Sequence, residues 1–108
     1  MKIRIPKQIK IGTHTYKVIY DRSIRTDDDR IGECNHRTQT IEIEPNLPPS
    51  RQDQTFLHEV GHLIRKVYVM QEDEDNIDRT AQGFADLLFN NLGIEFVWDD
   101  ITEVNNGS

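Results

Sequence analysis

The stretch FLHEVGHLI, residues 56–64, constrains this chain more than any other, because it places three ionisable side chains inside an apolar run. Around it, apolar residues recur at spacings of three and four, which is typical of an amphipathic helix: Phe56, Leu57, Val60, Leu63, Ile64 and Val67. The pattern predicts a helix from about Ser50 to Val69, with Ser50 as N-cap and Asp53 completing a weaker form of the capping box.

Two histidines four residues apart lie on the same face of a helix, so His58 and His62 can both point at one ion. Zinc accepts neutral imidazole nitrogens in a tetrahedral arrangement. Glu59 is one residue further round the helix than His58, so it is placed to take a proton from a zinc-activated water instead of binding the metal. This is the chemistry of the H-E-x-x-H pattern.

The alternative is a helix whose His58, Glu59 and His62 are simply hydrogen-bonded, without a metal. Burying these groups without partners costs several kcal/mol, which favours the metal site. Gly61 inside the predicted helix costs about 1 kcal/mol relative to alanine. That loss indicates that a crossing helix or a ligand approaches closely there.

A catalytic zinc also needs a third protein ligand. No third histidine follows soon after His62, so a carboxylate is expected, and the candidates are Glu72, Asp73, Glu74, Asp75, Asp78 and Asp86. Asp78 is preferred, because Ala81 and Ala85 after it would let a second helix pack closely against the first. Glu74, one turn earlier and with a longer reach, is the alternative.

The rest of the chain predicts strands followed by helices. Residues 7–20 alternate around a Gly12-Thr13 turn and predict a hairpin, and residues 31–44 predict a second one with its turn near 35–37. A second helix is expected from Ile77 to Leu92, ended by Gly93. The fold class is therefore α+β, a small N-terminal antiparallel or mixed sheet followed by two packed helices. We expect one domain, residues 1–93, and a C-terminal tail, residues 94–108.

Composition excludes several classes of protein. The 108 residues carry a net charge of −6, which argues against nucleic-acid binding. The single cysteine, Cys34, allows no intrachain disulfide. No apolar run approaches the ~18 residues of a membrane span, and the N-terminus lacks the apolar centre of a signal peptide. We therefore expect a soluble, cytoplasmic protein that binds neither membrane nor nucleic acid.

The segments TFLHEVGHLI and DRTAQGFADLLFNNLG together resemble the small gluzincin-type metallopeptidases, in particular the ImmA/IrrE-like proteins and their short relatives in phages and prophages. The resemblance covers roughly residues 3–92. It implies a minimal zincin-like fold, a bound Zn²⁺, and a location in a bacterial or phage-infected cell. The family usually has glutamate where this chain has Asp78. It also implies that the strand before the active-site helix, here residues 40–44, pairs with an extended peptide substrate.

The primary hypothesis is peptide-bond hydrolysis, with His58, His62 and Asp78 holding Zn²⁺ and Glu59 as general base. Tyr68, His36 and His14 are candidate donors to the oxyanion. The alternative is a zinc-stabilised module that binds a peptide or protein without cleaving it. The apolar residues 96–98 of the tail could lie in the cleft and inhibit the enzyme; the alternatives are a closing strand or a segment that contacts a partner. The substrate and the oligomeric state stay open.

Overall fold

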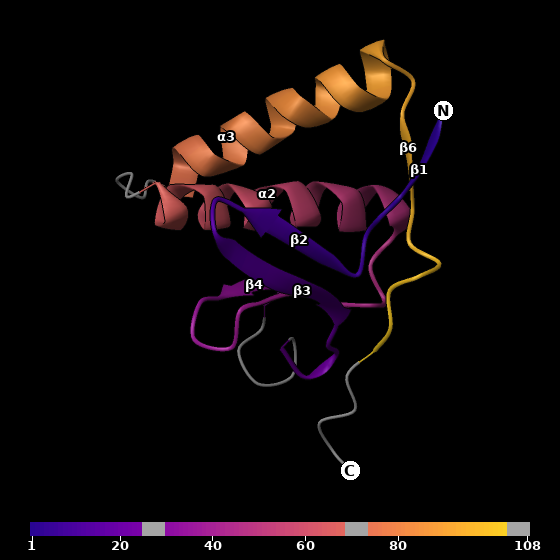
Figure 1. Ribbon diagram of the computed structural model, residues 1–108. Coiled ribbons are helices and arrows are strands. Elements are labelled where there is room, and N and C mark those ends of the chain that lie inside the picture. Colours follow the sequence, from indigo (N-terminus) through magenta and orange to yellow (C-terminus); the bar gives the residue numbers. More distant parts are fainter. Residues whose placement is uncertain (25–29, 69–73, 104–108) are drawn as a thin grey trace.

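A computed structural model describes residues 1–24, 30–68 and 74–103. Figure 1 shows three layers, with a sheet at the bottom, helix α2 (Pro49–Val67) across it, and helix α3 (Glu74–Ala85) on top. The sheet has four strands in the order β2-β3-β5-β4, and a second sheet pairs β1 with β6. The predicted α+β class is confirmed, with strands first and two packed helices after them.

Both predicted hairpins form. β2 (Gln8–Ile11) pairs antiparallel with β3 (His14–Tyr20), and Gly12 between them has φ +62°, a conformation that favours glycine. β4 (Gly32–Asn35) pairs antiparallel with β5 (Thr40–Ile43). β5 also pairs with β3, in parallel, so it lies inside the sheet.

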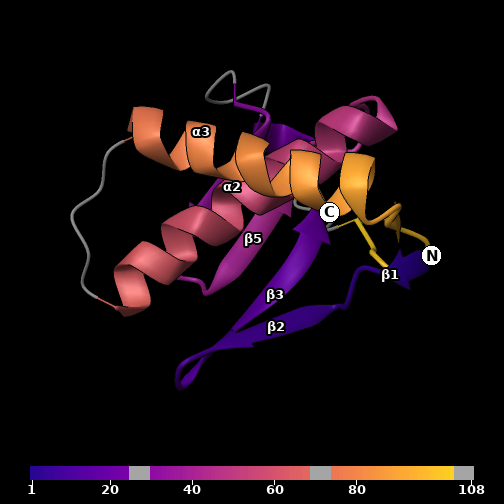
Figure 2. The same cartoon turned by 90° about the horizontal axis from the view of Figure 1, so that it is seen from above.

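The core lies between the sheet and α2, the two elements that Figure 2 shows stacked beneath α3. Ile41 and Ile43 of β5 are fully buried, as is Leu63 of α2. Since side chains alternate across a strand, these two isoleucines turn the same face of β5 toward the helix. This packing fixes α2 on the sheet, and the side of α2 that carries His58 and His62 faces the beginning of α3.

The beginning of α2 differs from the prediction. The helix starts at Pro49, its N-cap residue is Pro48, and no side chain caps it. Ser50 therefore lies inside the helix, because proline already supplies a suitable φ for the first turn. Asp53 forms no capping box; its Oδ1 instead accepts a hydrogen bond from Trp98 Nε1 at 2.7 Å.

The close approach inferred from Gly61 is confirmed. A β-carbon at Gly61 would lie 3.1 Å from Cγ2 of Ile77, a buried residue of α3. α3 starts at Glu74, one turn before the predicted beginning, and continues as the π-helix η1 (Asp86–Asn91). Gly93 follows with φ +65°, in agreement with the predicted stop.

The segment after Gly93 packs against the domain. β6 (Glu95–Val97) pairs in parallel with β1 (Lys2–Arg4), and Figure 1 shows the two strands side by side. Ile101 is buried, and the guanidinium of Arg4 contacts Asp100 at 2.7 Å. The described residues of the tail thus form a closing strand, which is one of the predicted possibilities.

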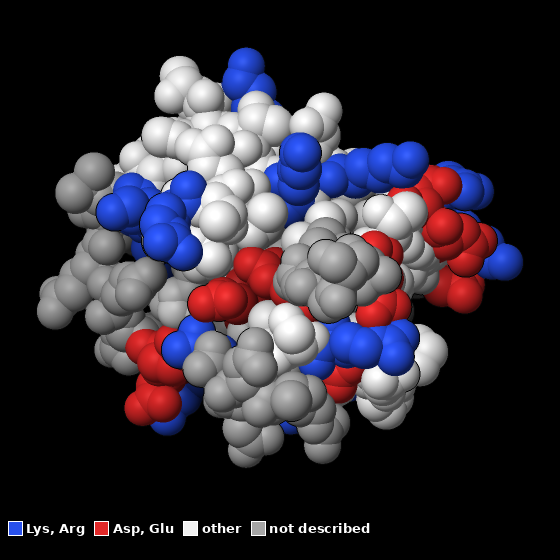
Figure 3. Space-filling model, turned by 90° about the horizontal axis from the view of Figure 1, so that it is seen from below, with Lys and Arg blue, Asp and Glu red and all other residues white. Residues whose placement is uncertain are grey.

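The surface carries charges of both signs. Figure 3, which views the molecule from the sheet side, shows acidic and basic side chains mixed across this face. Within the described part of the chain, no helix is both long and apolar enough to cross a membrane.

Candidate metal centre

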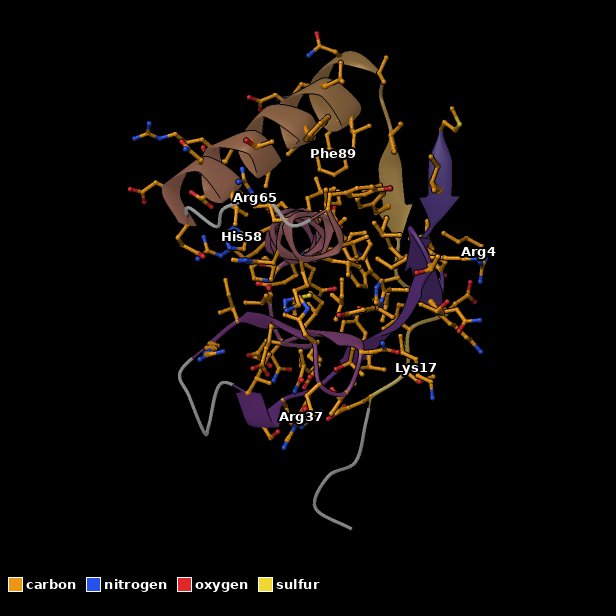
Figure 4. All side chains as sticks on the ribbon, turned by 60° about the vertical axis from the view of Figure 1, so that its left-hand side comes forward. Arg4, Lys17, Arg37, His58, Arg65 and Phe89 are labelled. Carbon is orange, nitrogen blue, oxygen red and sulfur yellow. The ribbon has the colours of Figure 1, made fainter. Side chains whose placement is uncertain are left out.

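Three side chains from two helices converge beside α2. His58 and His62 lie one turn apart on α2, and their Nε2 atoms are 3.3 Å from each other. Glu74, in the first turn of α3, places Oε1 at 2.7 Å from His58 Nε2 and Oε2 at 3.0 Å from His62 Nε2. Figure 4 shows His58 where α2 faces the beginning of α3.

This donor set fits a metal ion. Zinc–nitrogen bonds of about 2.0–2.1 Å in a tetrahedral arrangement place two donor atoms about 3.3 Å apart. One ligand atom from each of His58, His62 and Glu74 lies within 4.8 Å of the other two. These side chains offer three ligand atoms to one cation, because an imidazole nitrogen without a proton carries a lone pair that can bind a metal, as does a carboxylate oxygen.

Asp78 contacts the other ring nitrogen of His58. Its Oδ1 lies 3.5 Å from Nδ1, and its carboxylate also accepts a hydrogen bond from Gln82 Nε2 at 2.9 Å. Metal-binding histidines usually donate their second ring N–H to such a carboxylate. The structure therefore brings the alternative residue Glu74, and not the preferred Asp78, to the Nε2 atoms. Among the remaining candidates, Glu72 and Asp73 lie outside the described residues.

Glu59 lies beneath the two histidines and is only 8% exposed. Burial raises the pKa of its carboxyl, and the neighbouring His58 and His62 partly offset that rise. Gly32 of β4 makes room for it: a β-carbon there would lie 3.2 Å from Oε2 of Glu59 and 2.4 Å from Cγ2 of Thr55. The sequence reading missed this role of Gly32, because it depends on a contact between distant segments.

A cavity of about 940 Å³ opens over these residues. Its wall is formed by the beginning of α3, one side of α2 and the segment from Arg30 to His36, which includes β4. Among the described residues, β4 is the last strand of its sheet. The expectation that residues 40–44 form the peptide-accepting edge is wrong, because β5 already has a partner on each side.

The three candidate oxyanion donors are spread over the molecule. His36 lines the cavity, and its Nδ1 is 2.8 Å from the hydroxyl of Tyr16. His14 lines a smaller pocket of about 130 Å³ beside His36. Tyr68 is 62% exposed at the end of α2 and is not among the residues of either pocket. Of the three candidates for the oxyanion donor, His36 is therefore favoured, because it lines the cavity that holds His58 and His62.

A helix that carries two histidines and a buried glutamate, faced by a carboxylate from the next helix, defines a metallopeptidase-like domain. The sequence model of the IrrE N-terminal-like domain, a peptidase family, matches residues 9–96. The chain belongs to this family, which confirms the resemblance to ImmA/IrrE-like proteins. Comparisons with curated proteins and with solved structures give no match.

Proposed function

We propose that this protein is a zinc-dependent peptidase whose metal is held by His58, His62 and Glu74. The observation that carries the proposal is the convergence of these three side chains on one point beside a buried carboxylate, at the wall of a large cavity. Family membership supports the peptidase chemistry. The mixed histidine and carboxylate ligand set is one that catalytic zinc uses.

The ion, when bound, supplies a Lewis acid that polarises a carbonyl and acidifies water. Asp78 orients the ring of His58 through Nδ1 and keeps Nε2 directed toward Glu74. Glu59 acts as the base that accepts a proton and returns it to the leaving amine. Its carboxyl is largely buried beside the cavity, and this burial raises its pKa, which favours acceptance of a proton.

The substrate is a peptide in extended conformation that lies along β4. An unpaired strand edge offers backbone N–H and C=O groups to an added strand. β4 meets this requirement, because it ends the sheet and borders the cavity. Gly32 at its beginning has no side chain to separate the strand from Glu59. An added peptide would thus pass directly over the catalytic carboxylate.

The test is Glu59→Gln in zinc-loaded protein, assayed by mass spectrometry for new termini in a pool of unstructured peptides. We expect cleavage by the wild type and loss of at least about 1,000-fold in the variant, since no general base remains. Zinc content should be unchanged. Glu95→Gln, which removes the same charge at an exposed position of β6, should cleave as the wild type does. Turnover retained by Glu59→Gln would refute the mechanism. Stoichiometric zinc without any turnover in the wild type would favour a binding module.

A further inference from the structure

β4 and α2, which form two walls of the cavity, run in the same direction. Gly32, the first residue of β4, lies against Thr55 and Glu59 in the middle of α2. His36, just after β4, shares a pocket with Lys66 and Val67 near the end of α2. The residues that precede Gly32 and those that precede Thr55 therefore lie at the same end of the cavity. Arg30 and Arg51 are the cavity-lining residues found there.

Both arginines that line the cavity lie at this end, whereas Glu59, Glu74 and Asp78 lie around the candidate metal centre. The carboxylates that line the cavity are those of Glu33, Glu59, Glu74 and Asp78. Arg30 is already engaged, because its Nη1 lies 3.1 Å from Glu33 Oε1. Arg51 is exposed, and no carboxylate within the described residues forms an ion pair with it. An arginine that faces the cavity without such a partner is available to a carboxylate from outside.

The position of Arg51 sets its distance from the metal centre. It precedes His58 by seven residues, which is two turns, so both lie on the same side of α2. At 1.5 Å per residue their Cα atoms are about 10 Å apart along the helix axis. An extended peptide advances about 3.3 Å per residue, so this distance corresponds to about three residues of substrate.

We infer that Arg51 forms a subsite for a carboxylate of the substrate, about three residues from the bond that is cut. The inference rests on the proposed function and adds a substrate class to it. A guanidinium binds a carboxylate through two parallel N–H···O bonds, which gives this contact both strength and orientation. Two groups supply the same chemistry, the side chain of aspartate or glutamate and the C-terminal carboxylate of a peptide.

The experiment uses one parent peptide in which Glu, Gln or Lys is placed at each position in turn, made with a free and with an amidated C-terminus. Cleavage is measured with the zinc-loaded wild type, and binding with the Glu59→Gln protein, so that recognition is read without turnover. Arg51→Gln and Arg51→Glu are compared with Arg37→Gln. Arg37 is an exposed arginine after β4 that does not line the cavity, and Figure 4 shows it beyond the sheet, away from His58.

We expect at least tenfold preference for Glu over Gln at one position about three residues from the cut, in binding and in cleavage. Arg51→Gln should abolish the preference, Arg51→Glu should reverse it toward Lys, and Arg37→Gln should keep it. A preference that follows the free C-terminus and disappears on amidation identifies the terminal carboxylate as the ligand. Cleavage without any dependence on charge would overturn the inference and leave the proposed function intact. Arg51-dependent binding of acidic peptides without cleavage would support the carboxylate subsite and overturn the proposed peptidase function.

Discussion

Oε1 of Glu74 lies 2.7 Å from Nε2 of His58, although the two residues are 16 positions apart in the chain. One turn further along α3, Asp78 lies beside Nδ1 of the same ring. Glu74 and Asp78 thus each lie beside a different ring nitrogen of His58. Because Nε2 is also the atom that His58 directs toward His62, this geometry supports the proposal that Glu74 binds the metal and Asp78 orients the ring.

Glu74→Gln and Asp78→Asn should therefore differ in their effect on metal content. We expect Glu74→Gln to lose zinc on dialysis, since a neutral amide is a poor ligand. Asp78→Asn should keep zinc but bind it about 10- to 100-fold more weakly, as is usual when the partner of a ligand is lost. Elemental analysis and competition with a chelator measure both. Asp75→Asn, an exposed change in the same turn as Glu74, is the control. The opposite order of the two variants would support the sequence-based choice of Asp78.

Gly32→Ala should impair catalysis more than folding. The new methyl group would meet Thr55 Cγ2 at 2.4 Å and Glu59 Oε2 at 3.2 Å, so Thr55 must shift and the carboxylate of Glu59 must give by a few tenths of an ångström. A misplacement of about 1 Å can lower the rate about 100-fold. Thr55→Ser lacks the methyl group that gives the shortest contact, so the double variant should recover part of kcat. An alanine variant with full kcat would show that β4 does not confine Glu59.

The sequence predicted the helix that carries His58, Glu59 and His62, because that signal is local. His58, Glu59 and His62 are separated by fixed helical spacings, and Gly61 correctly indicated a helix crossing. The choice between Glu74 and Asp78 was harder, because the two residues lie one turn apart on the same helix. Only the distance between α2 and α3 decides which carboxylate reaches the histidines, and that distance depends on packing.

The edge of the sheet could not be predicted for a related reason. Residues 40–44 alternate as an edge strand would, but β5 has a second, parallel partner in β3, which is distant in sequence. The alternation of Ile41 and Ile43 with Glu42 indicates one buried face and does not show which strands lie on either side. Likewise, Asp53 matched a capping pattern, whereas its actual partner is Trp98, 45 residues away.

The buried carboxyl of Glu42 should make stability depend on pH. Burial is the main cause that raises its pKa to about 7; the hydrogen bond from Thr40 opposes this rise, and Asp21 and Glu33 add to it. The folded state thus holds a proton that the unfolded chain has already released above about pH 4.5, the ordinary value. The free energy of unfolding should therefore fall as pH rises from about 4.5 to about 7, and then level off. Urea unfolding at a series of pH values measures this.

Glu42→Gln should flatten that pH dependence, because a neutral amide replaces the carboxyl and carries no titrating proton. Glu95→Gln, at an exposed position, should leave the slope between pH 4.5 and 7 as it is in the wild type. If the slope persisted undiminished in Glu42→Gln, its source would be another group. The variants are compared by the slope of the free energy of unfolding against pH. A uniform change in stability caused by either substitution does not affect this slope.

Trp98 should prove important for stability and should not act as an inhibitor of the site. Its indole stacks on Tyr20 with ring centroids 5.7 Å apart, meets Phe56 edge to face at 5.5 Å, and donates its N–H to Asp53. Trp98→Ala should lower the free energy of unfolding by about 3 kcal/mol, since it removes a large side chain packed against the core. Trp98→Phe should cost about 1 kcal/mol, mainly for the lost hydrogen bond. Peptide cleavage by folded Trp98→Phe should equal that of the wild type, because neither Trp98 nor Asp53 lines the cavity. A rise in activity in this variant would instead support inhibition by the tail.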